Sequence, residues 1–449
     1  MALSITTLRT RVEDPAQRAS IRVAIFITAA VILNSLVGMF SGEKMSFLFK
    51  EVMGLSASQV ATLGIITGIP GYLRPFMGAA SDFVPILGYH RRAYFAISWI
   101  LTGLGFLGLT ILHQYHVSMV VCLVLVTAAG GNLLYVIMDA VMVAIGNETG
   151  TIGRLQSLQQ FLPLGLGIAF VASTSGYVTQ HWSYGLCFGS AAGVAFLGVL
   201  LTPLINEKRQ FAARQKHETE EDHAARMAAR AAERARIREA LGRAARSPGL
   251  WAMVGFVFYL IITPGTGLAQ FYYSVDVLHF DKQFIGNLGR YGSAGAIVAM
   301  LLFASLSRKL PVRAMIWGAY LMDCSLYLVS MGLHDKTSGM VIAFALSLLG
   351  MIYNLCLLTV AARACPPGIE GTIYGLVIAA ITLAGALGEK MGSSIYDYFG
   401  PSHHYPTAHG WFTLLWFGFA FTVIAVVFIP FLPEWTKSSE PITGGRSIG

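Results

Sequence analysis

The sequence predicts an all-α membrane protein with twelve transmembrane helices in two six-helix bundles. Three observations lead to this fold class. Of the 449 residues, 55% are hydrophobic and 12% are charged, and the mean hydropathy is +0.63, which excludes a soluble globular protein of this length. Apolar segments long enough to cross about 30 Å of hydrocarbon, which takes roughly 20 residues, recur along the chain. A charged segment near the middle then divides these apolar segments into two equal groups.

The N-terminal half, residues 1–205, is predicted to form the first six-helix bundle. Its apolar runs are rich in Leu, Val, Ile, Phe, Ala and Gly, and short polar loops separate them. We expect its six helices at Val23–Phe47, Gln59–Phe76, Ala93–Leu112, Ser118–Ile145, Leu158–Ser175 and Leu186–Leu204.

Residues 206–248 are predicted to form a cytoplasmic linker between the bundles, because this segment is rich in Ala, Arg and Glu and contains no apolar span. Within it, Glu218–Arg246 combines good helix formers with interleaved opposite charges. We therefore expect a charged helix there, either amphipathic or solvent-exposed.

The second six-helix bundle is predicted at residues 249–434, and residues 435–449 form a cytoplasmic tail. Pro264-Gly265 and Gly267 fall inside the first span of this half and predict a bend or local unwinding. We expect the six helices at Leu250–Tyr273, Phe284–Ser305, Val312–Leu333, Gly339–Ala361, Ile373–Ser394 and Trp411–Phe431.

The basic residues predict the orientation in the membrane. The formal net charge of +8 would suggest nucleic acid as the partner of a soluble protein, but here the charge follows the positive-inside rule. We therefore expect both termini in the cytoplasm, in a plasma (inner) membrane, with the lipid bilayer and no nucleic acid as partner. The residues that indicate this are Arg9, Arg11, Arg18 and Arg22 before the first span, and Arg91, Arg92, Arg154, Arg308, Lys309, Arg363 and Lys437 at alternate junctions.

Neither a metal nor another cofactor is expected. The five cysteines have no metal-ligand spacing and are interpreted as small apolar residues. A P-loop is absent, so direct ATP hydrolysis by this chain is not expected.

Six spans, a charged linker and six further spans resemble the plan of the major facilitator superfamily. The segment Asp82–Arg92 fits the loop after the second helix, and Ser307–Arg313 holds the corresponding place after the eighth. The resemblance implies a secondary transporter that works by alternating access, with its substrate pathway between the two halves. It assigns a gating role to Asp82, Arg91 and Arg92, whereas a plain positive-inside loop is the alternative for this segment.

Three segments resemble the folate-biopterin transporter family in particular. They are Arg74-Pro75 through Tyr94, then Asp139-Ala140 followed by Gly153–Ser157, and Cys365–Leu376. The resemblance implies a folate-like or pterin-like organic anion as substrate. The chain departs from the family pattern because no asparagine lies near Leu383 and no tryptophan lies beside Pro264. Muropeptides, acyl-CoA-like compounds, and lipid or pigment precursors therefore remain alternative substrates.

Two charged doublets lie in the outer parts of predicted spans, Glu43-Lys44 in the first and Glu389-Lys390 in the eleventh. Ionisable groups inside a membrane are costly and mark functional sites. Glu43 with Lys390, or Lys44 with Glu389, would form an outer gate, whereas solvated helix ends are the alternative. Lys44 is also a candidate for substrate binding, and Glu43 for proton coupling.

Asp139 is the leading candidate for proton coupling, because a carboxyl group within the fourth span could carry a proton during transport. A structural ion pair with Arg154 or Arg74 is the alternative. Arg74 and Arg290 are candidates for binding the anion, since a guanidinium offers two parallel hydrogen bonds to a carboxylate.

Aromatic and amide side chains complete the predicted substrate site. Tyr272, Tyr291 and Asn354 would form a wall for stacking and hydrogen bonding with a flat heterocycle, although helix packing is the alternative for each. The protein is expected to act as a monomer on a small-molecule substrate, with the proton as coupling ion. A non-transporting receptor or scaffold is the competing function class, and a membrane-embedded enzyme is disfavoured because no catalytic set stands out.

Overall fold

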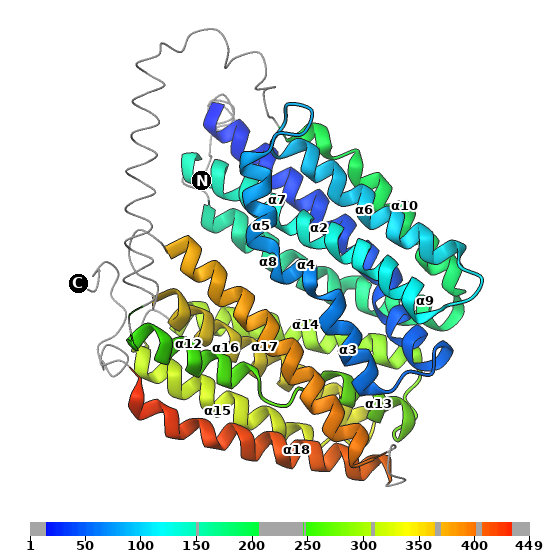
Figure 1. Ribbon diagram of the computed structural model, residues 1–449, viewed down its shortest axis with the longest axis vertical. Coiled ribbons are helices and arrows are strands. Elements are labelled where there is room, and N and C mark those ends of the chain that lie inside the picture. Colours follow the sequence, from blue (N-terminus) through cyan, green and yellow to red (C-terminus); the bar gives the residue numbers. More distant parts are fainter. Residues whose placement is uncertain are drawn as a thin grey trace, which may run out of the picture. The chain divides into compact units, whose positions relative to one another are not determined.

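The computed structural model of the chain is built from helices that run close to one another within each part of the molecule (Figure 1). It describes residues 15–149, 152–205, 246, 248–306, 310–363, 370–400 and 406–432, and within them the only β-type pairing is an isolated bridge between Ile86 and Tyr89. The predicted linker helix and the C-terminal tail lie outside the described residues. The prediction of an all-helical fold is confirmed.

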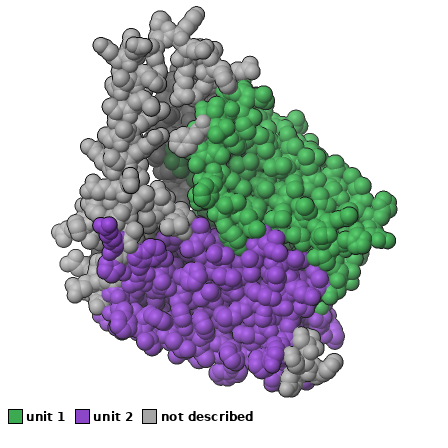
Figure 2. Space-filling model, in the orientation of Figure 1, with its two compact units in different colours: residues 1–54, 67–213, 282–290 green, residues 55–66, 214–281, 291–449 purple. Residues whose placement is uncertain are grey.

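The chain divides into two compact units, coloured separately in Figure 2. Unit 1 comprises residues 1–54, 67–213 and 282–290, and unit 2 comprises residues 55–66, 214–281 and 291–449. The units thus follow the two halves of the sequence except for two short segments, each of which packs with the opposite half. The domain boundaries at residues 205 and 248 stay a prediction.

Unit 1 is built around α2, which packs against α7, α8, α9 and α10, while α6 packs against α7 and α10. Aromatic residues fill its centre: the rings of Phe26 and Phe95 are 4.9 Å apart, and Trp99 is completely buried beside them. Its α-helices are α2 (Pro15–Phe47), α4 (Ile69–Tyr72), α5 (Arg74–Phe83), α6 (Arg92–Ile111), α7 (Val117–Thr149), α8 (Ile152–Leu166), α9 (Ala172–His181) and α10 (Tyr184–Val199). Short helices at Leu48–Val52 (η1), Gly167–Val171 (η2) and Thr202–Leu204 (η3) follow α2, α8 and α10.

Unit 2 has its own apolar core, in which Met253, Phe256 and Leu260 pack with Ile316 and Leu357. Its helices are most of α3 (Ala57–Thr67), then α12 (Pro248–Ile261), α13 (Gly267–Asp276), the larger part of α14 (Lys282–Leu306), α15 (Val312–Ser330), α16 (Lys336–Arg363), α17 (Glu370–Tyr398), α18 (Thr407–Ile424) and the 3₁₀-helix η6 (Ala425–Phe431).

The predicted second span is helical but is divided into three helices. The segment forms α3, α4 and α5, with breaks at Gly68 and Leu73. Pro70 and Pro75 lie in the first turns of α4 and α5, where the missing backbone N–H of proline costs no helical hydrogen bond. Further along a helix, proline would interrupt the series of backbone hydrogen bonds. The positions of Pro70 and Pro75 therefore explain why new helices begin at these points.

The predicted seventh span is interrupted where Pro264 and Gly265 led us to expect it. Helix α12 ends at Ile261 and α13 begins at Gly267. Hydrogen bonds from other helices satisfy the unwound backbone: Gly265 N donates to Gly388 O at 2.8 Å, and the Tyr327 hydroxyl donates to Pro264 O at 2.8 Å. The predicted interruption is therefore confirmed.

Eight helices of the described chain are long and apolar enough to cross a membrane. The other four predicted spans coincide with the split segments α3–α5 and α12–α13 and with α15 and α17. This composition identifies an integral membrane protein.

Candidate functional site

A cluster of polar side chains lies within unit 1, on helices that are otherwise apolar. Its members come from four helices: Asn34 from α2, Arg74 from α5, Asn132, Tyr135 and Asp139 from α7, and Gln159 from α8. Polar groups inside a membrane span are costly and are retained where they bind or carry something. We call this set the unit 1 polar cluster.

Arg74 is the cation of the unit 1 polar cluster. Its Nε donates a hydrogen bond of 2.7 Å to Asn132 Oδ1, and its guanidinium carbon lies 5.7 Å from the centre of the Tyr135 ring. Arg74 is exposed, and its terminal nitrogens have no hydrogen-bond partner among the described residues. The contacts therefore fix the orientation of the guanidinium and leave its two-nitrogen edge available to an anion.

Tyr135 presents an aromatic surface next to this cation. Its side chain is 38% exposed, and its hydroxyl accepts a hydrogen bond of 3.1 Å from Asn34 Nδ2. The bond to α2 holds the ring in place, which lowers the entropic cost of stacking a flat group on it.

Asp139 lies one helical turn beyond Tyr135 on α7 and is exposed. Gln159 Nε2 donates to its Oδ1 at 2.9 Å. In the part of the chain that the structure describes, no ion pair joins Asp139 to Arg74, and the side chain of Arg154 lies outside that part. In this structure Asp139 thus has a neutral amide as its hydrogen-bond partner, and the alternative of a structural ion pair stays untested.

The predicted doublets take partners within their own units. Lys44 is only 4% exposed and donates to Thr179 O at 2.9 Å and to Trp182 O at 2.6 Å, at the end of α9. An ammonium group is favourable at this place, because the last carbonyls of a helix carry partial negative charge. These contacts make Lys44 a brace between α2 and α9 in this structure, and its predicted role in substrate binding stays a prediction.

Glu389 and Lys390 connect α17 to two other segments of unit 2. Glu389 accepts a hydrogen bond of 2.6 Å from Leu268 N, in the first turn of α13, and Lys390 donates to Ser58 O of α3 at 2.9 Å. A carboxylate at a helix N-terminus is stabilised by the unpaired N–H groups there. Glu43 is half-buried in α2, and its pairing with Lys390 stays a prediction.

The predicted aromatic wall differs in part from the structure. Tyr272 is 6% exposed, and its hydroxyl donates to the backbone carbonyl of Leu55. It therefore packs inside unit 2 in this structure, and its contact with substrate stays a prediction. Tyr291 and Asn354 are exposed, and their contact with substrate stays a prediction. Arg290 is exposed as well and donates to the hydroxyl of Ser173 on α9.

The predicted cytoplasmic gate residues form a connected set within unit 1. The Arg91 guanidinium lies 3.8 Å from the Asp82 carboxylate and donates to Ala140 O on α7 at 2.8 Å. The Arg92 guanidinium lies 5.3 Å from the centre of the Tyr89 ring. These contacts connect α5, α6 and α7, while the gating role itself stays a prediction.

Four members of the unit 1 polar cluster were not predicted from the sequence: Asn34, Asn132, Tyr135 and Gln159. Neutral side chains in apolar helices give a weak signal compared with charges. The spacing of Asn132, Tyr135 and Asp139, three and four residues apart, would have placed them on one face of a helix.

Comparisons with known proteins identify transporter relatives for the chain. A folate-biopterin transporter of Synechocystis sp. is 26% identical over 369 residues, covering 79% of this chain and 71% of that protein. Folate transporter 1 of Plasmodium falciparum is 18% identical over 379 residues, covering 81% of this chain and 72% of that protein. A probable folate-biopterin transporter of Arabidopsis thaliana is 22% identical and covers 88% of this chain and 92% of that protein.

Solved structures of major facilitator superfamily transporters show the same fold at low identity. The nucleoside transporter NupG has a TM-score of 0.68 at 11% identity, covering 92% of this chain and all of that chain. A D-xylose-proton symporter has a TM-score of 0.63 at 15% identity, covering 93% of this chain and 99% of that chain.

These relatives and structural neighbours are transporters and not enzymes, which confirms the prediction of a membrane transporter. The model of the BT1 family matches residues 36–441, which are 406 of the 449 residues. The chain therefore belongs to the BT1 family.

Proposed function

We propose that this transporter moves a folate-like or pterin-like anion by alternating access and that the unit 1 polar cluster binds it. The observation that carries the proposal is the pairing of a cation with an aromatic ring: the Arg74 guanidinium lies 5.7 Å from the centre of the exposed Tyr135 ring. A solute with a carboxylate and a flat heterocycle needs both groups. The names of the relatives from Synechocystis and Plasmodium support the same substrate class.

Each member of the cluster has a distinct task in this proposal. The free edge of the Arg74 guanidinium binds a carboxylate through two parallel hydrogen bonds. The Tyr135 ring stacks on the heterocycle. Asn132 and Asn34 hold these two groups through the bonds of 2.7 and 3.1 Å described above, so they position the site and need no contact with substrate.

Proton coupling is assigned to Asp139. Its carboxylate is exposed, shares helix α7 with Tyr135, and has a neutral partner in Gln159. A carboxylate whose hydrogen bond comes from a neutral amide changes its protonation state at a smaller cost than one in an ion pair. A proton taken up at Asp139 would offset one negative charge of the solute during transport. Glu43, which is half-buried in α2, is the second proposed proton site.

Arg290, Tyr291 and Asn354 are proposed as further substrate contacts. All three are exposed on α14 or α16, and Arg290 supplies a second guanidinium. Asp82, Arg91 and Arg92 remain the proposed cytoplasmic gate, and Glu389 and Lys390 the proposed outer gate. For the outer pair, the bonds from Leu268 N and to Ser58 O support a role in positioning α13 and α3.

We further propose that the protein is a monomer in the plasma (inner) membrane with both termini in the cytoplasm. The distribution of Arg and Lys in the sequence supports this orientation. Single cysteines introduced at Gln114 and Asp335, in loops expected outside, should react with an impermeant thiol reagent in intact cells. A cysteine at Ile86, in a loop expected inside, should react only after permeabilisation. The reverse pattern would overturn the orientation.

The proposal is tested with the purified protein in liposomes. Uptake of labelled folate, a reduced folate and biopterin is measured with and without an inward proton gradient, for the wild type, Arg74→Gln, Asp139→Asn and the control Arg22→Gln. Arg22 is an exposed arginine of α2 outside the cluster. We expect uptake driven by the gradient, lost in Arg74→Gln and uncoupled from the gradient in Asp139→Asn.

Two outcomes would contradict the proposal in different ways. Absence of uptake of all three compounds by folded wild-type protein would overturn the substrate class. Uptake that is unchanged in Arg74→Gln would retain the substrate and overturn the site.

A further inference from the structure

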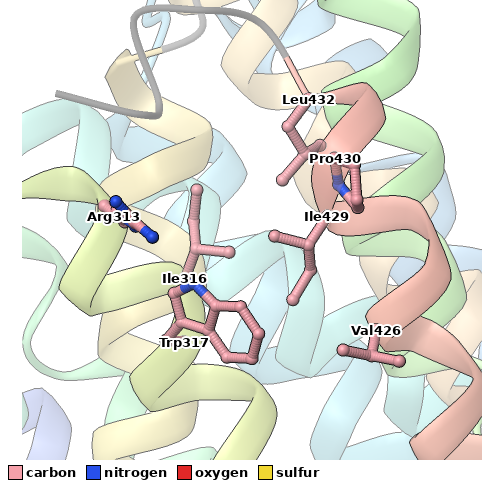
Figure 3. A pocket seen from close by; sticks show the side chains of 7 residues that line it. All are labelled: Arg313, Ile316, Trp317, Val426, Ile429, Pro430 and Leu432. Carbon is pink, nitrogen blue, oxygen red and sulfur yellow. The ribbon is translucent and has the colours of Figure 1, made fainter.

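A pocket of about 340 Å³ opens in unit 2 between α15 and the 3₁₀-helix η6. One end carries a cation and the rest is apolar: Arg313 stands at the start of α15, and the side chains of Ile316 and Trp317 face the segment from Val426 to Leu432 (Figure 3). The lining residues are Arg313, Ile316, Trp317, Val426, Ile429, Pro430 and Leu432. This pocket is separate from the unit 1 polar cluster and has no part in the proposed transport.

One contact within α15 and one between α15 and α18 support the wall of the pocket. The Tyr320 hydroxyl donates to Val423 O at 3.4 Å, and the Trp317 and Tyr320 rings meet edge to face with their centres 5.9 Å apart. Pro430 has no backbone N–H and lies near the end of η6, where the chain becomes extended at Leu432. These features support the wall of the pocket that α15 and η6 form.

The apolar end of the pocket continues into exposed apolar surface. Leu321 and Leu328 lie on the same side of α15 as Trp317, and they are 53% and 47% exposed. On η6, the neighbouring Val427 is 57% exposed. From Arg313 to Leu328 the helix rises about 22 Å, which exceeds the roughly 15 Å that one leaflet contributes to the hydrocarbon core.

Arg313 places a positive charge at the other end of the pocket, at the start of α15. It is exposed, it is the second residue of α15, and it has no hydrogen bond or ion pair to any residue that the structure describes. In the sequence, Arg308 and Lys309 precede it by four or five positions. A basic residue at the end of a membrane helix, next to an apolar groove, as Arg313 is here, has the charge and depth that suit a lipid phosphate.

We infer that this pocket binds an anionic phospholipid, with the headgroup phosphate on Arg313 and an acyl chain against Trp317 and Ile429. The positive charge of Arg313 favours an anionic headgroup. The apolar wall favours a ligand with an acyl chain, which free phosphate does not have. A lipid bound here would bridge α15 and η6 and stabilise unit 2 of the folded protein.

The inference is tested by thermal unfolding of the purified protein in detergent, with added phosphatidylglycerol, phosphatidylcholine of the same acyl chains, or inorganic phosphate. The wild type, Arg313→Gln, Ile429→Trp and the control Arg22→Gln are compared. Ile429→Trp fills the pocket and leaves Arg313 in place. We expect phosphatidylglycerol to raise the unfolding midpoint more than phosphatidylcholine in the wild type and in the control. This difference should be lost in both pocket variants.

The inference would be overturned if both lipids raised the unfolding midpoint of the wild type equally. It would also be overturned if the difference between the two lipids persisted in Arg313→Gln. A response to inorganic phosphate as large as that to phosphatidylglycerol would do so as well, because it would identify a site for a free anion.

Discussion

The carboxylate of Asp397 accepts a hydrogen bond of 2.8 Å from the backbone N–H of Ser58, although the two residues are 339 positions apart. Ser58 lies in the first turn of α3, where the N–H groups have no intrahelical partner. Ser56 and Gln59 cap the same turn reciprocally, with Gln59 Oε1 accepting from Ser56 N at 2.9 Å. Asp397, buried on α17, thus completes the cap of a helix from the other half of the sequence.

We expect Asp397→Ala to lower the stability of the protein by about 1 kcal/mol, which is typical for the loss of a helix cap. The midpoint of thermal unfolding of the purified protein measures this loss. Asp397→Asn is the matched control, because it keeps an acceptor oxygen and should lose less. Equal midpoints for Asp397→Ala and the wild type would show that this bond does not stabilise α3.

A substitution of Arg74 can separate the effect of its positive charge on substrate affinity from the effect of the shape of its guanidinium. Arg74→Lys keeps the positive charge and removes the two-nitrogen edge, so we expect the KM of folate uptake to rise about tenfold or more, in line with roughly 1.5–3 kcal/mol for hydrogen bonds to a charged group. Initial rates of uptake into proteoliposomes measure this change.

Substitutions of Tyr135 test whether its ring stacks on the substrate. Tyr135→Leu removes the ring and should raise the KM, whereas Tyr135→Phe keeps the ring, loses only the bond from Asn34, and should change the KM less. A larger effect of Tyr135→Phe would argue against stacking and in favour of the hydroxyl as the substrate contact.

Gly286 of α14 meets Gly176 of α9 so closely that a Cβ atom on Gly286 would collide with the Gly176 backbone. Because backbone atoms cannot move aside as a side chain does, we expect Gly286→Ala to lower stability by about 1–3 kcal/mol. Gly38→Ala is the control, since no atom lies within 4 Å of a Cβ at that position of α2. Thermal unfolding that is lowered equally by both substitutions would refute the packing argument.

Asp335 lies outside the membrane spans, and we expect it to make the stability of the protein depend on pH. It caps α16, and hydrogen bonds from Ser338, including one of 2.6 Å from Ser338 N to Asp335 Oδ1, lower the pKa of its carboxyl group. A group whose pKa falls on folding stabilises the fold above its ordinary pKa and loses this effect as the pH falls through the folded value.

The midpoint of thermal unfolding should therefore differ between the wild type and Asp335→Asn at pH 7, and the difference should shrink below about pH 4, near the ordinary pKa of aspartate. A difference that is constant between pH 7 and pH 3 would assign the effect to shape and not to charge.

Much of the fold was predictable from the sequence because hydropathy decides which segments enter a membrane. Pro264 and Gly265 also revealed the interruption between α12 and α13. The breaks at Gly68 and Leu73 escaped prediction, because the apolar composition of that segment continues across them and only the proline positions mark the new helix starts.

The candidate site was predictable only where a residue carries a charge. Arg74 and Asp139 stood out in apolar spans, whereas the neutral Asn34 and Gln159 did not. Burial depends on partners that are remote in the chain, as with Tyr272 and Leu55, which are 217 positions apart. A linear pattern contains no such information, which is why Tyr272 was assigned to substrate.

The exchange of short segments between the two compact units has a consequence for biosynthesis. Unit 1 includes residues 282–290, so it remains incomplete on the ribosome until the linker, α12 and α13 have also been translated. Chains fold from the N-terminal end during synthesis where they can, and incomplete parts expose surface in the meantime. The nascent first half should therefore depend longer on the insertion machinery and its chaperones than a self-contained six-helix bundle would. A chain truncated before residue 282 should be a substrate for membrane proteases.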